Sequence, residues 1–231
     1  MFYLKRIIAL TIALTIALPS GTAFAENGNR EILISALKKL HGVSGFDYRE
    51  TTYLRRGKDQ QYEIKLRVVD DAYRAKEKTA PFAGPQPDIE VVIDGVLLKL
   101  PSYMPNIVGD SVALNPTLSN GKSHVYDFDI VLRDKKKYSK YFSGQLYLDS
   151  ETRSISSVET FVIKKFRFNL VNSTSKFDSV TQFIDFDAET TLPIKFENVT
   201  EGRRFFSRFF VEFKQEREGY TRINEKTNLL K

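Results

Sequence analysis

Short runs in which apolar and polar residues alternate fill the chain from Gly45 onward, and this pattern is what most restricts the fold. In one such run, charged residues separate Tyr62, Ile64 and Leu66, which predicts a half-buried strand. Such patterns predict strands at residues 46–53, 62–68, 72–78, 89–93, 96–100, 125–132, 141–148, 155–163, 166–170, 177–186, 193–199 and 205–213. Asp94-Gly95 is a strong hairpin signal between two of them. Many short strands joined by tight turns predict a curved, mainly antiparallel sheet.

One amphipathic helix precedes these strands. Leu33, Ala36, Leu37 and Leu40 recur at three- and four-residue spacing, which predicts a helix over residues 30–41. Burial of four such side chains stabilises the helix by about 6 kcal/mol, too little for a helix on its own. We therefore expect a mainly β (α+β) fold in which this N-terminal helix packs on or in the concave face of the sheet.

The first 25 residues have the organisation of a secretory signal peptide. Lys5 and Arg6 precede an apolar run at residues 7–18, and Ala23-Phe24-Ala25 matches the small-x-small cleavage pattern. As a helix, that run spans roughly 18 Å, which is short of the roughly 30 Å of a bilayer core. The pattern predicts cleavage after Ala25, export to a periplasm and a single domain over residues 26–231. An uncleaved membrane anchor is the alternative interpretation.

The stretch from residue 101 to residue 122 differs in character from its surroundings. It contains Pro101, Pro105 and Pro116 and has little periodicity. A long irregular connection inside a compact domain often has a functional role. We expect this stretch to form a lid or a loop.

Phenylalanine is concentrated in the second half of the chain, where 14 of the 18 Phe residues lie at or beyond Phe128. One short helix cannot cover the inner face of a sheet with this many strands. Either side chains fill the interior, or an apolar cavity remains for a hydrophobic ligand. If a cavity remains, we expect its lining to include Tyr62, Ile64, Leu66, Phe166, Phe168, Phe196 and Phe209.

Several kinds of chemistry find no support in the composition. The chain has no cysteine and two histidines, which argues against thiolate chemistry and multi-histidine metal sites. No motif of the common nucleophilic, nucleotide-binding or metalloprotease types is present. We expect no catalytic residue, metal or cofactor. Two Asp-x-Asp pairs, at residues 127–129 and 185–187, would suit a glycosidase pair or calcium, but a solvated strand face explains them more simply.

The charge of the chain bears on its partners. Without residues 1–25 the charge is about 33 − 29 = +4, which makes nucleic acid an improbable ligand for an exported protein. Residues 133–137 and 202–204 form basic runs. We expect these runs at exposed hairpin tips, where they could contact anionic lipid head groups or a protein partner.

The order of these elements resembles that of the LolA/LolB-like outer-membrane lipoprotein-sorting proteins. The helix is followed by an aromatic strand, then by Tyr62–Val68, an Ile-Asp-Gly hairpin at residues 93–95, and a second hairpin whose first strand is Gly-Gln-Leu-Tyr-Leu-Asp at residues 144–149. The resemblance implies a half-open antiparallel barrel in which a helical lid covers an apolar cavity. It also implies transport or sensing of acylated molecules in the periplasm.

Together these observations favour a non-enzymatic periplasmic protein that binds a lipid or the acyl chains of a lipoprotein, and that would carry this ligand between membranes. Envelope membrane proteins are further candidate partners. One alternative is an envelope-stress regulatory or interaction module on the same scaffold without a ligand. Two others are an enzyme that uses the Asp pairs and a small outer-membrane barrel.

Overall fold

A computed structural model of the chain describes residues 20–70, 73, 88–132, 135–167, 169, 172–205 and 207–223. The chain divides into two compact units, residues 1–32 and 33–231. The first is described from Ser20 onward, as the beginning of helix α1 (Ser20–Lys38). The second holds the end of α1 and all of the described strands. In the described part of the chain, we find no helix with the length and apolar character needed to cross a membrane.

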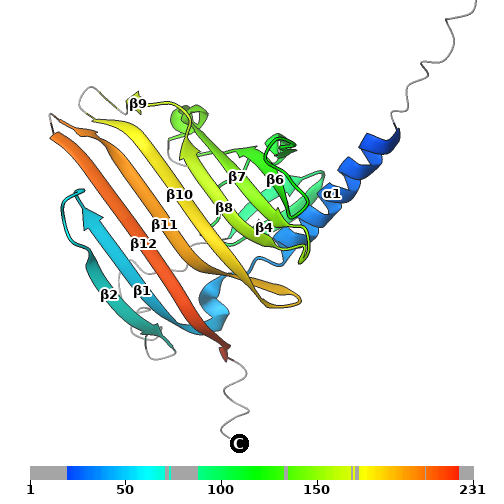
Figure 1. Ribbon diagram of the computed structural model, residues 1–231, viewed down its shortest axis with the longest axis horizontal. Helices are drawn as coiled ribbons and strands as arrows, with labels where there is room; N and C mark the ends of the chain where they lie inside the picture. The colour runs from blue at the N-terminus through cyan, green and yellow to red at the C-terminus, as the bar shows by residue number, and fades with distance from the viewer. Residues whose placement is uncertain are drawn as a thin grey trace, which may run out of the picture. The chain divides into compact units, whose positions relative to one another are not determined.

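The second unit is built mainly of strands (Figure 1). Ten strands form the main sheet: β1 (Phe46–Arg56), β2 (Glu63–Val69), β5 (Ala113–Leu114), β6 (Ser123–Asp129), β7 (Phe142–Asp149), β8 (Ile155–Val162), β9 (Phe166–Arg167), β10 (Asn172–Asp187), β11 (Thr190–Arg204) and β12 (Ser207–Arg222). A separate hairpin consists of β3 (Ile89–Ile93) and β4 (Val96–Leu100). Short 3₁₀ turns are η1 (Val43–Gly45), η2 (Gly109–Ser111) and η3 (Lys136–Tyr141).

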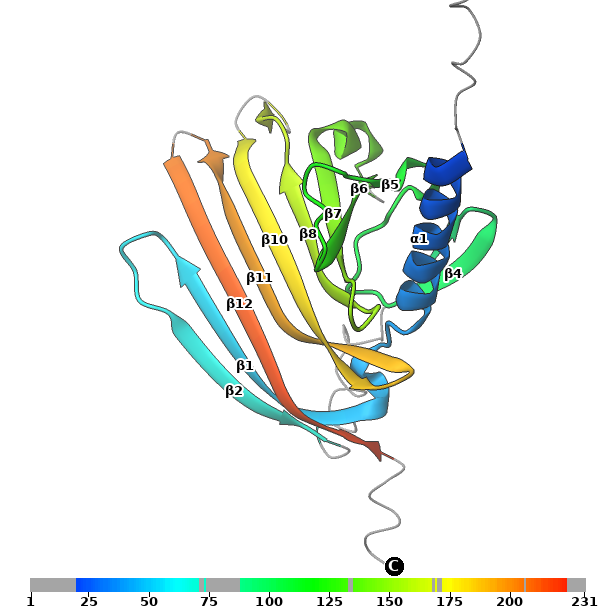
Figure 2. The same cartoon turned by 45° about the vertical axis from the view of Figure 1, so that its right-hand side comes forward.

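The main sheet is antiparallel and open. Its strand order is β2-β1-β12-β11-β10-β8-β7-β6-β5, with β9 paired to β10. Among the described strands, β2 and β5 are the two edges and do not pair with each other. The long strands β10 to β12 bend along their length (Figures 1 and 2). The predicted fold class, mainly β with a large unclosed antiparallel sheet and one helix, is confirmed.

Turn chemistry explains the β3–β4 hairpin. Asp94 and Gly95 both have positive φ, 50° and 77°, as a two-residue turn of the primed type requires. The flanking strands then pair from Ile93–Val96 to Ile89–Leu100. This hairpin was predicted from the sequence and is confirmed.

The sheet has a buried face, which we call the inner face. Along β7, Phe142, Gly144, Leu146 and Leu148 are buried, whereas the residues between them are half-buried. Directly paired residues of antiparallel strands share a face. Pairing therefore extends the inner face from Leu146 through Val158, Thr181, Phe196, Gln215 and Thr52 to Lys65.

The opposite, outer face is mostly polar. The same pairing runs from Gln145 through Glu159, Val180, Glu197, Lys214 and Tyr53 to Ile64. Ion pairs join residues on this face: Lys214 lies 3.6 Å from Glu197 of the neighbouring strand and 3.2 Å from Glu212 of its own strand. This polar face explains why the strands alternate in sequence.

Helix α1 is longer than predicted. It begins at Ser20, ten residues before the expected start, and continues through Gly28 without a break to Lys38. Its apolar stripe is buried as expected, since Leu33, Ala36 and Leu37 are at most 1% exposed. The chain then bonds to β11, with the amide of Thr191 donating to the carbonyl of Lys39 at 2.8 Å. Residues 20–25 of the predicted signal peptide are helical, whereas residues 1–19 lie outside the described residues.

The stretch over residues 101–122 is irregular for most of its length, although it contains η2 and β5. Gly109 of η2 lies directly against β3, because a Cβ at this position would be 1.6 Å from the carbonyl oxygen of Val92. The stretch is therefore packed closely against the β3–β4 hairpin there. Apart from Tyr73, the predicted strand over residues 72–78 lies outside the described residues.

Candidate functional site

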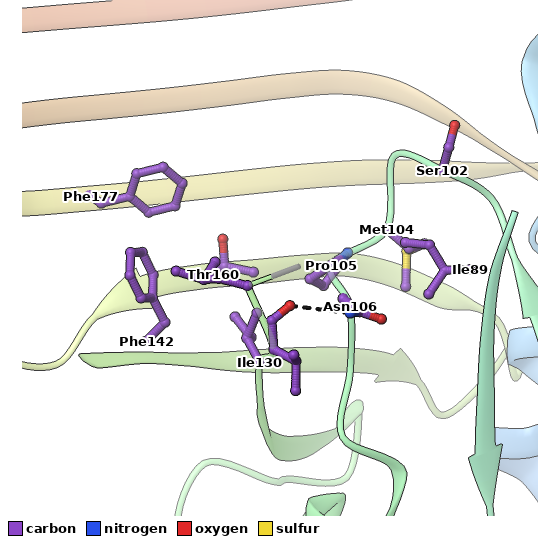
Figure 3. A pocket seen from close by; sticks show the side chains of 11 residues that line it. Ile89, Ser102, Met104, Pro105, Asn106, Ile130, Phe142, Thr160 and Phe177 are labelled. Carbon is purple, nitrogen blue, oxygen red and sulfur yellow. Dashed lines mark hydrogen bonds between the residues drawn. The ribbon is translucent and has the colours of Figure 1, made fainter. Parts of the chain in front are cut away.

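A pocket of about 330 Å³ lies on the inner face of the sheet (Figure 3). Its walls come from three strands of the main sheet, from the first residue of β3, from the residues directly after β6, and from the beginning of the 101–122 stretch. The lining residues are Ile89, Ser102, Met104, Pro105, Asn106, Ile130, Val131, Leu132, Phe142, Thr160 and Phe177.

Neighbouring strands supply the sheet side of this pocket. Phe142 of β7, Thr160 of β8 and Phe177 of β10 all point to the inner face, as the alternation along each strand requires. The rings of Phe142 and Phe177 meet edge to face, with centroids 5.5 Å apart. In Figure 3 the two rings stand on one side of the pocket, with Thr160 beside them.

The opposite wall is irregular backbone that is firmly bonded. Asn106 and Val131 exchange hydrogen bonds: the amide of Val131 donates to the carbonyl of Asn106 at 2.9 Å, and the Asn106 side-chain amide donates to the carbonyl of Val131 at 3.2 Å. One turn earlier, the amide of Met104 donates to the carbonyl of Pro101 at 2.9 Å. Met104 is 3% exposed, and its flexible side chain lies beside Ile89 in the lining of the pocket (Figure 3).

The chemistry of the lining is apolar. Ser102, Asn106 and Thr160 are its polar side chains, and no charged residue is among those that line it. Pockets of this kind, with mostly apolar walls and a few polar groups, suit ligands whose surface is largely hydrocarbon. A volume of about 330 Å³ is at the small end of the range for ligand sites, so the pocket would hold part of a long chain.

A second group of apolar side chains lies on the inner face, on the strands beyond the pocket. Phe209, Val211 and Phe213 of β12 point to the inner face and are half-buried. Phe196 of β11 meets Phe213 at a centroid distance of 5.9 Å, and Leu54 is paired with Phe213 from the other side. We call these five side chains the aromatic strip. Because they are only half-buried, the strip still offers apolar surface to a ligand.

Three of the seven predicted lining residues lie on or near this surface, and a fourth lies outside the described residues. Phe196 and Phe209 belong to the aromatic strip. Phe166 is 4% exposed and stacks on Tyr141 at 4.8 Å, behind Phe142 of the pocket wall. The residue outside the described part of the chain is Phe168.

The other three predicted residues lie on the outer face. Ile64 and Leu66 are 56% and 79% exposed on edge strand β2, and their pairing with β1 carries them away from the pocket. Tyr62 is half-buried beside Tyr53, with the guanidinium of Arg55 over its ring at 4.9 Å. The strand predicted from this alternation is present, but the alternation does not reveal which of its two faces is the inner one.

Some of the residues that line the pocket could be predicted from the sequence to face inward. Phe142 belongs to a predicted strand, and its spacing from Leu146 marks it as inward-facing. Phe177 likewise begins a predicted strand. Met104 and Asn106 lie in a segment without periodicity, so no sequence signal indicated them.

One cluster of buried charge lies on the inner face, where β2, β1 and β12 pair. Glu50 is 4% exposed and its carboxylate lies 3.2 Å from Arg67 Nε and 3.1 Å from Arg217 Nε. Tyr48 lies beneath the guanidinium of Arg217 at 5.7 Å. Burial is the main cause of the raised pKa of the nearby Tyr220, whose hydroxyl stays protonated and donates to the carbonyl of Pro193. This cluster is internally paired, and in the part of the chain that is described we find no group of three or more His, Cys, Asp and Glu residues that could hold a metal ion.

Comparison with known proteins gives one structural match. No protein-family model matches the sequence, and no curated protein matches it. The chain is similar to a solved LolA superfamily protein from Nitrosomonas europaea, with 10% sequence identity and a TM-score of 0.34, over 84% of this chain and 92% of that one. The match is to the superfamily that the order of elements in the sequence resembles. Because the superposition is weak, this match carries no argument about function.

Proposed function

We propose that this protein is an exported, periplasmic binding protein for an apolar or acylated ligand, such as a lipid or the acyl chains of a lipoprotein, and that it carries this ligand between membranes. The observation that supports the proposal is the uncharged pocket on the inner face, together with the half-buried aromatic strip on the same face. A soluble protein normally covers such a surface with its own side chains.

The energetics suit reversible binding. Each methylene removed from water contributes about 0.8 kcal/mol, so eight methylenes in the pocket contribute on the order of 6 kcal/mol. The remainder of a longer chain would lie on the aromatic strip and remain partly exposed to water. A ligand held in this way binds well and can still be released to a membrane.

Displacement of a fluorescent sixteen-carbon fatty acid tests binding. We expect saturable binding in the micromolar range, and we expect Thr160→Phe, which fills the pocket, to weaken it at least tenfold. Ser157→Phe is the matched control, because Ser157 is on the same strand but faces outward. Absence of binding at tens of micromolar lipid, or equal loss in both variants, would contradict the proposal.

A second measurement separates carriage from binding. A fluorescent lipid is placed in donor vesicles, and its arrival in acceptor vesicles is followed as protein is added. The carrier role predicts a transfer rate that rises with protein concentration and falls in the Thr160→Phe variant. If the protein binds the fatty acid but does not accelerate transfer, the binding role stands and the carrier role fails.

A further inference from the structure

Three segments of the second unit contain only basic charges. Residues 135–141, 163–167 and 203–208 contain ten Lys and Arg residues and no Asp or Glu. All ten of these side chains are exposed: Lys135, Lys136, Lys137, Lys140, Lys164, Lys165, Arg167, Arg203, Arg204 and Arg208. The sequence suggested that two basic runs would lie at hairpin tips, but it did not indicate that they would be neighbours.

Strand pairing brings the three segments together at one end of the strands, away from the edge strands β2 and β5. We call this end of the sheet the basic edge. The amide of Ile163 donates to the carbonyl of Tyr141 at 2.9 Å, which joins the first two segments. Arg167 pairs with Ser173, and Ser173 pairs with Arg203, which joins the second to the third. Figures 1 and 2 show β9, which is labelled in Figure 1, at the same end of the sheet as the end of β11 and the beginning of β12.

Two large apolar side chains project from the basic edge. Ile163, directly after β8, is 58% exposed, and Phe205, in the turn between β11 and β12, is 62% exposed. Phe205 also has a φ of 55°, a conformation that a bulky residue adopts rarely. Exposed apolar residues among cations are typical of surfaces that insert into the head-group region of a bilayer.

We propose that the basic edge docks the protein on an anionic membrane surface, with Phe205 and Ile163 inserted between the lipid head groups. The charges favour anionic lipid, since clustered Lys and Arg residues are attracted to the negative potential of such a membrane. The apolar residues favour a lipid surface over a nucleic acid, which would require only the cations. This docking is independent of whether the pocket binds a ligand.

Co-sedimentation with vesicles tests the proposal. The protein is expressed from the full sequence and used in the form that the expressing cells produce. We expect binding to vesicles of 30% phosphatidylglycerol in phosphatidylcholine, and at least tenfold weaker binding to phosphatidylcholine alone or in 0.5 M salt. The variant R203Q/R204Q/R208Q should bind at least tenfold more weakly. Phe205→Ser should bind several-fold more weakly, with an unchanged dependence on salt.

A variant with the same loss of charge is the control. K99Q/K122Q/R153Q removes three exposed cations from outside the basic edge and should bind like the unmodified chain. Unchanged circular dichroism and melting temperature show that each variant folds. Equal binding to both vesicle types, equal effects of the two triple variants, or binding to single-stranded RNA that is as tight as binding to the anionic vesicles would overturn the proposal.

Discussion

The ring of Phe128 occupies the space that a side chain on Gly144 would need. A Cβ added to Gly144 would lie 2.3 Å from two ring carbons of Phe128 and 3.0 Å from the carbonyl oxygen of Glu159. Phe128 and Gly144 are paired across β6 and β7, and Phe128 is 2% exposed. The absence of a side chain at Gly144 thus lets a buried ring lie flat on the inner face, beside the strand that carries Phe142.

Replacement of this glycine should therefore destabilise the protein. Elsewhere in a strand, Gly→Ala is neutral or stabilising, but Gly144→Ala must displace a fully buried ring and should lower the free energy of unfolding by about 1–3 kcal/mol. Urea denaturation measures the change. Gly121→Ala is the control, since a Cβ on Gly121 would have no other atom within 4 Å, and it should leave the urea midpoint unchanged.

Glu50 should be more important for stability than any surface carboxylate. Its side chain is 4% exposed and its partner Arg217 is 13% exposed, so Glu50→Ala leaves a largely buried cation without its carboxylate. We expect a loss of about 3–5 kcal/mol in the free energy of unfolding. Glu218→Ala, which removes an exposed ion pair with Arg49, should cost less than about 1 kcal/mol.

A double variant distinguishes a buried unpaired charge from a general packing defect. Replacing Glu50 and its more buried partner, in Glu50→Leu with Arg217→Leu, removes the two largely buried charges together and should recover most of the stability lost in Glu50→Ala, because the remaining cation, Arg67, is 38% exposed to water. If the double variant is less stable than the single one, the cluster contributes through packing rather than through charge.

Stability should decline in acid partly because of Glu212. Burial raises the pKa of Glu212, but hydrogen bonds from Tyr62, Arg55 and Lys214 outweigh it, so that the pKa lies below the usual 4.5. A carboxylate with a lowered pKa stabilises the folded state fully above its unfolded pKa and loses this effect as the pH falls through its folded pKa. Glu212→Gln should therefore lower the free energy of unfolding by about 1–2 kcal/mol at pH 7.

The pH dependence provides the test. Between pH 7 and about 4.5 the difference between Glu212→Gln and the unmodified chain should stay constant, and below pH 4.5 it should shrink. Urea midpoints over this range measure both effects. A difference that persists unchanged at pH 2 would show that the substitution acts through something other than this ionisation.

Local patterns were sufficient to predict the strands but not their faces or ends. Asp94-Gly95 specifies its turn by backbone chemistry, so that hairpin could be predicted from residues alone. Strand β2 was recognised by its alternation, but its apolar residues were expected on the inner face. They lie on the outer face, whereas Arg67 points inward and forms an ion pair with the buried carboxylate of Glu50. A period of two does not indicate which face of a strand is the inner one, because that depends on how the strand pairs with its neighbours.

The candidate site was predictable only where regular strands form it. Phe142 and Phe177 belong to strands whose alternation is visible, whereas Met104 and Asn106 are placed by hydrogen bonds between irregular segments. The basic edge was missed for a similar reason. Residues 135–141 and 203–208 are far apart in sequence, and the strand pairing of the folded chain brings them to the same end of the sheet. The sequence pattern does not reveal this pairing.

The aromatic strip provides a last prediction, which separates a binding role from a packing role. Phe213 points to the inner face and Phe161 to the outer face, and both are half-buried. Truncation to Ala should therefore cost the two variants similar amounts of stability, about 1–3 kcal/mol. If the strip holds the ligand, Phe213→Ala should in addition weaken fatty-acid binding about tenfold, because the apolar surface offered to the chain is lost. Phe161→Ala should leave the dissociation constant unchanged. Fluorescence titration of both variants at one temperature, well below their melting temperatures, makes the comparison, and equal affinities would assign Phe213 to packing alone.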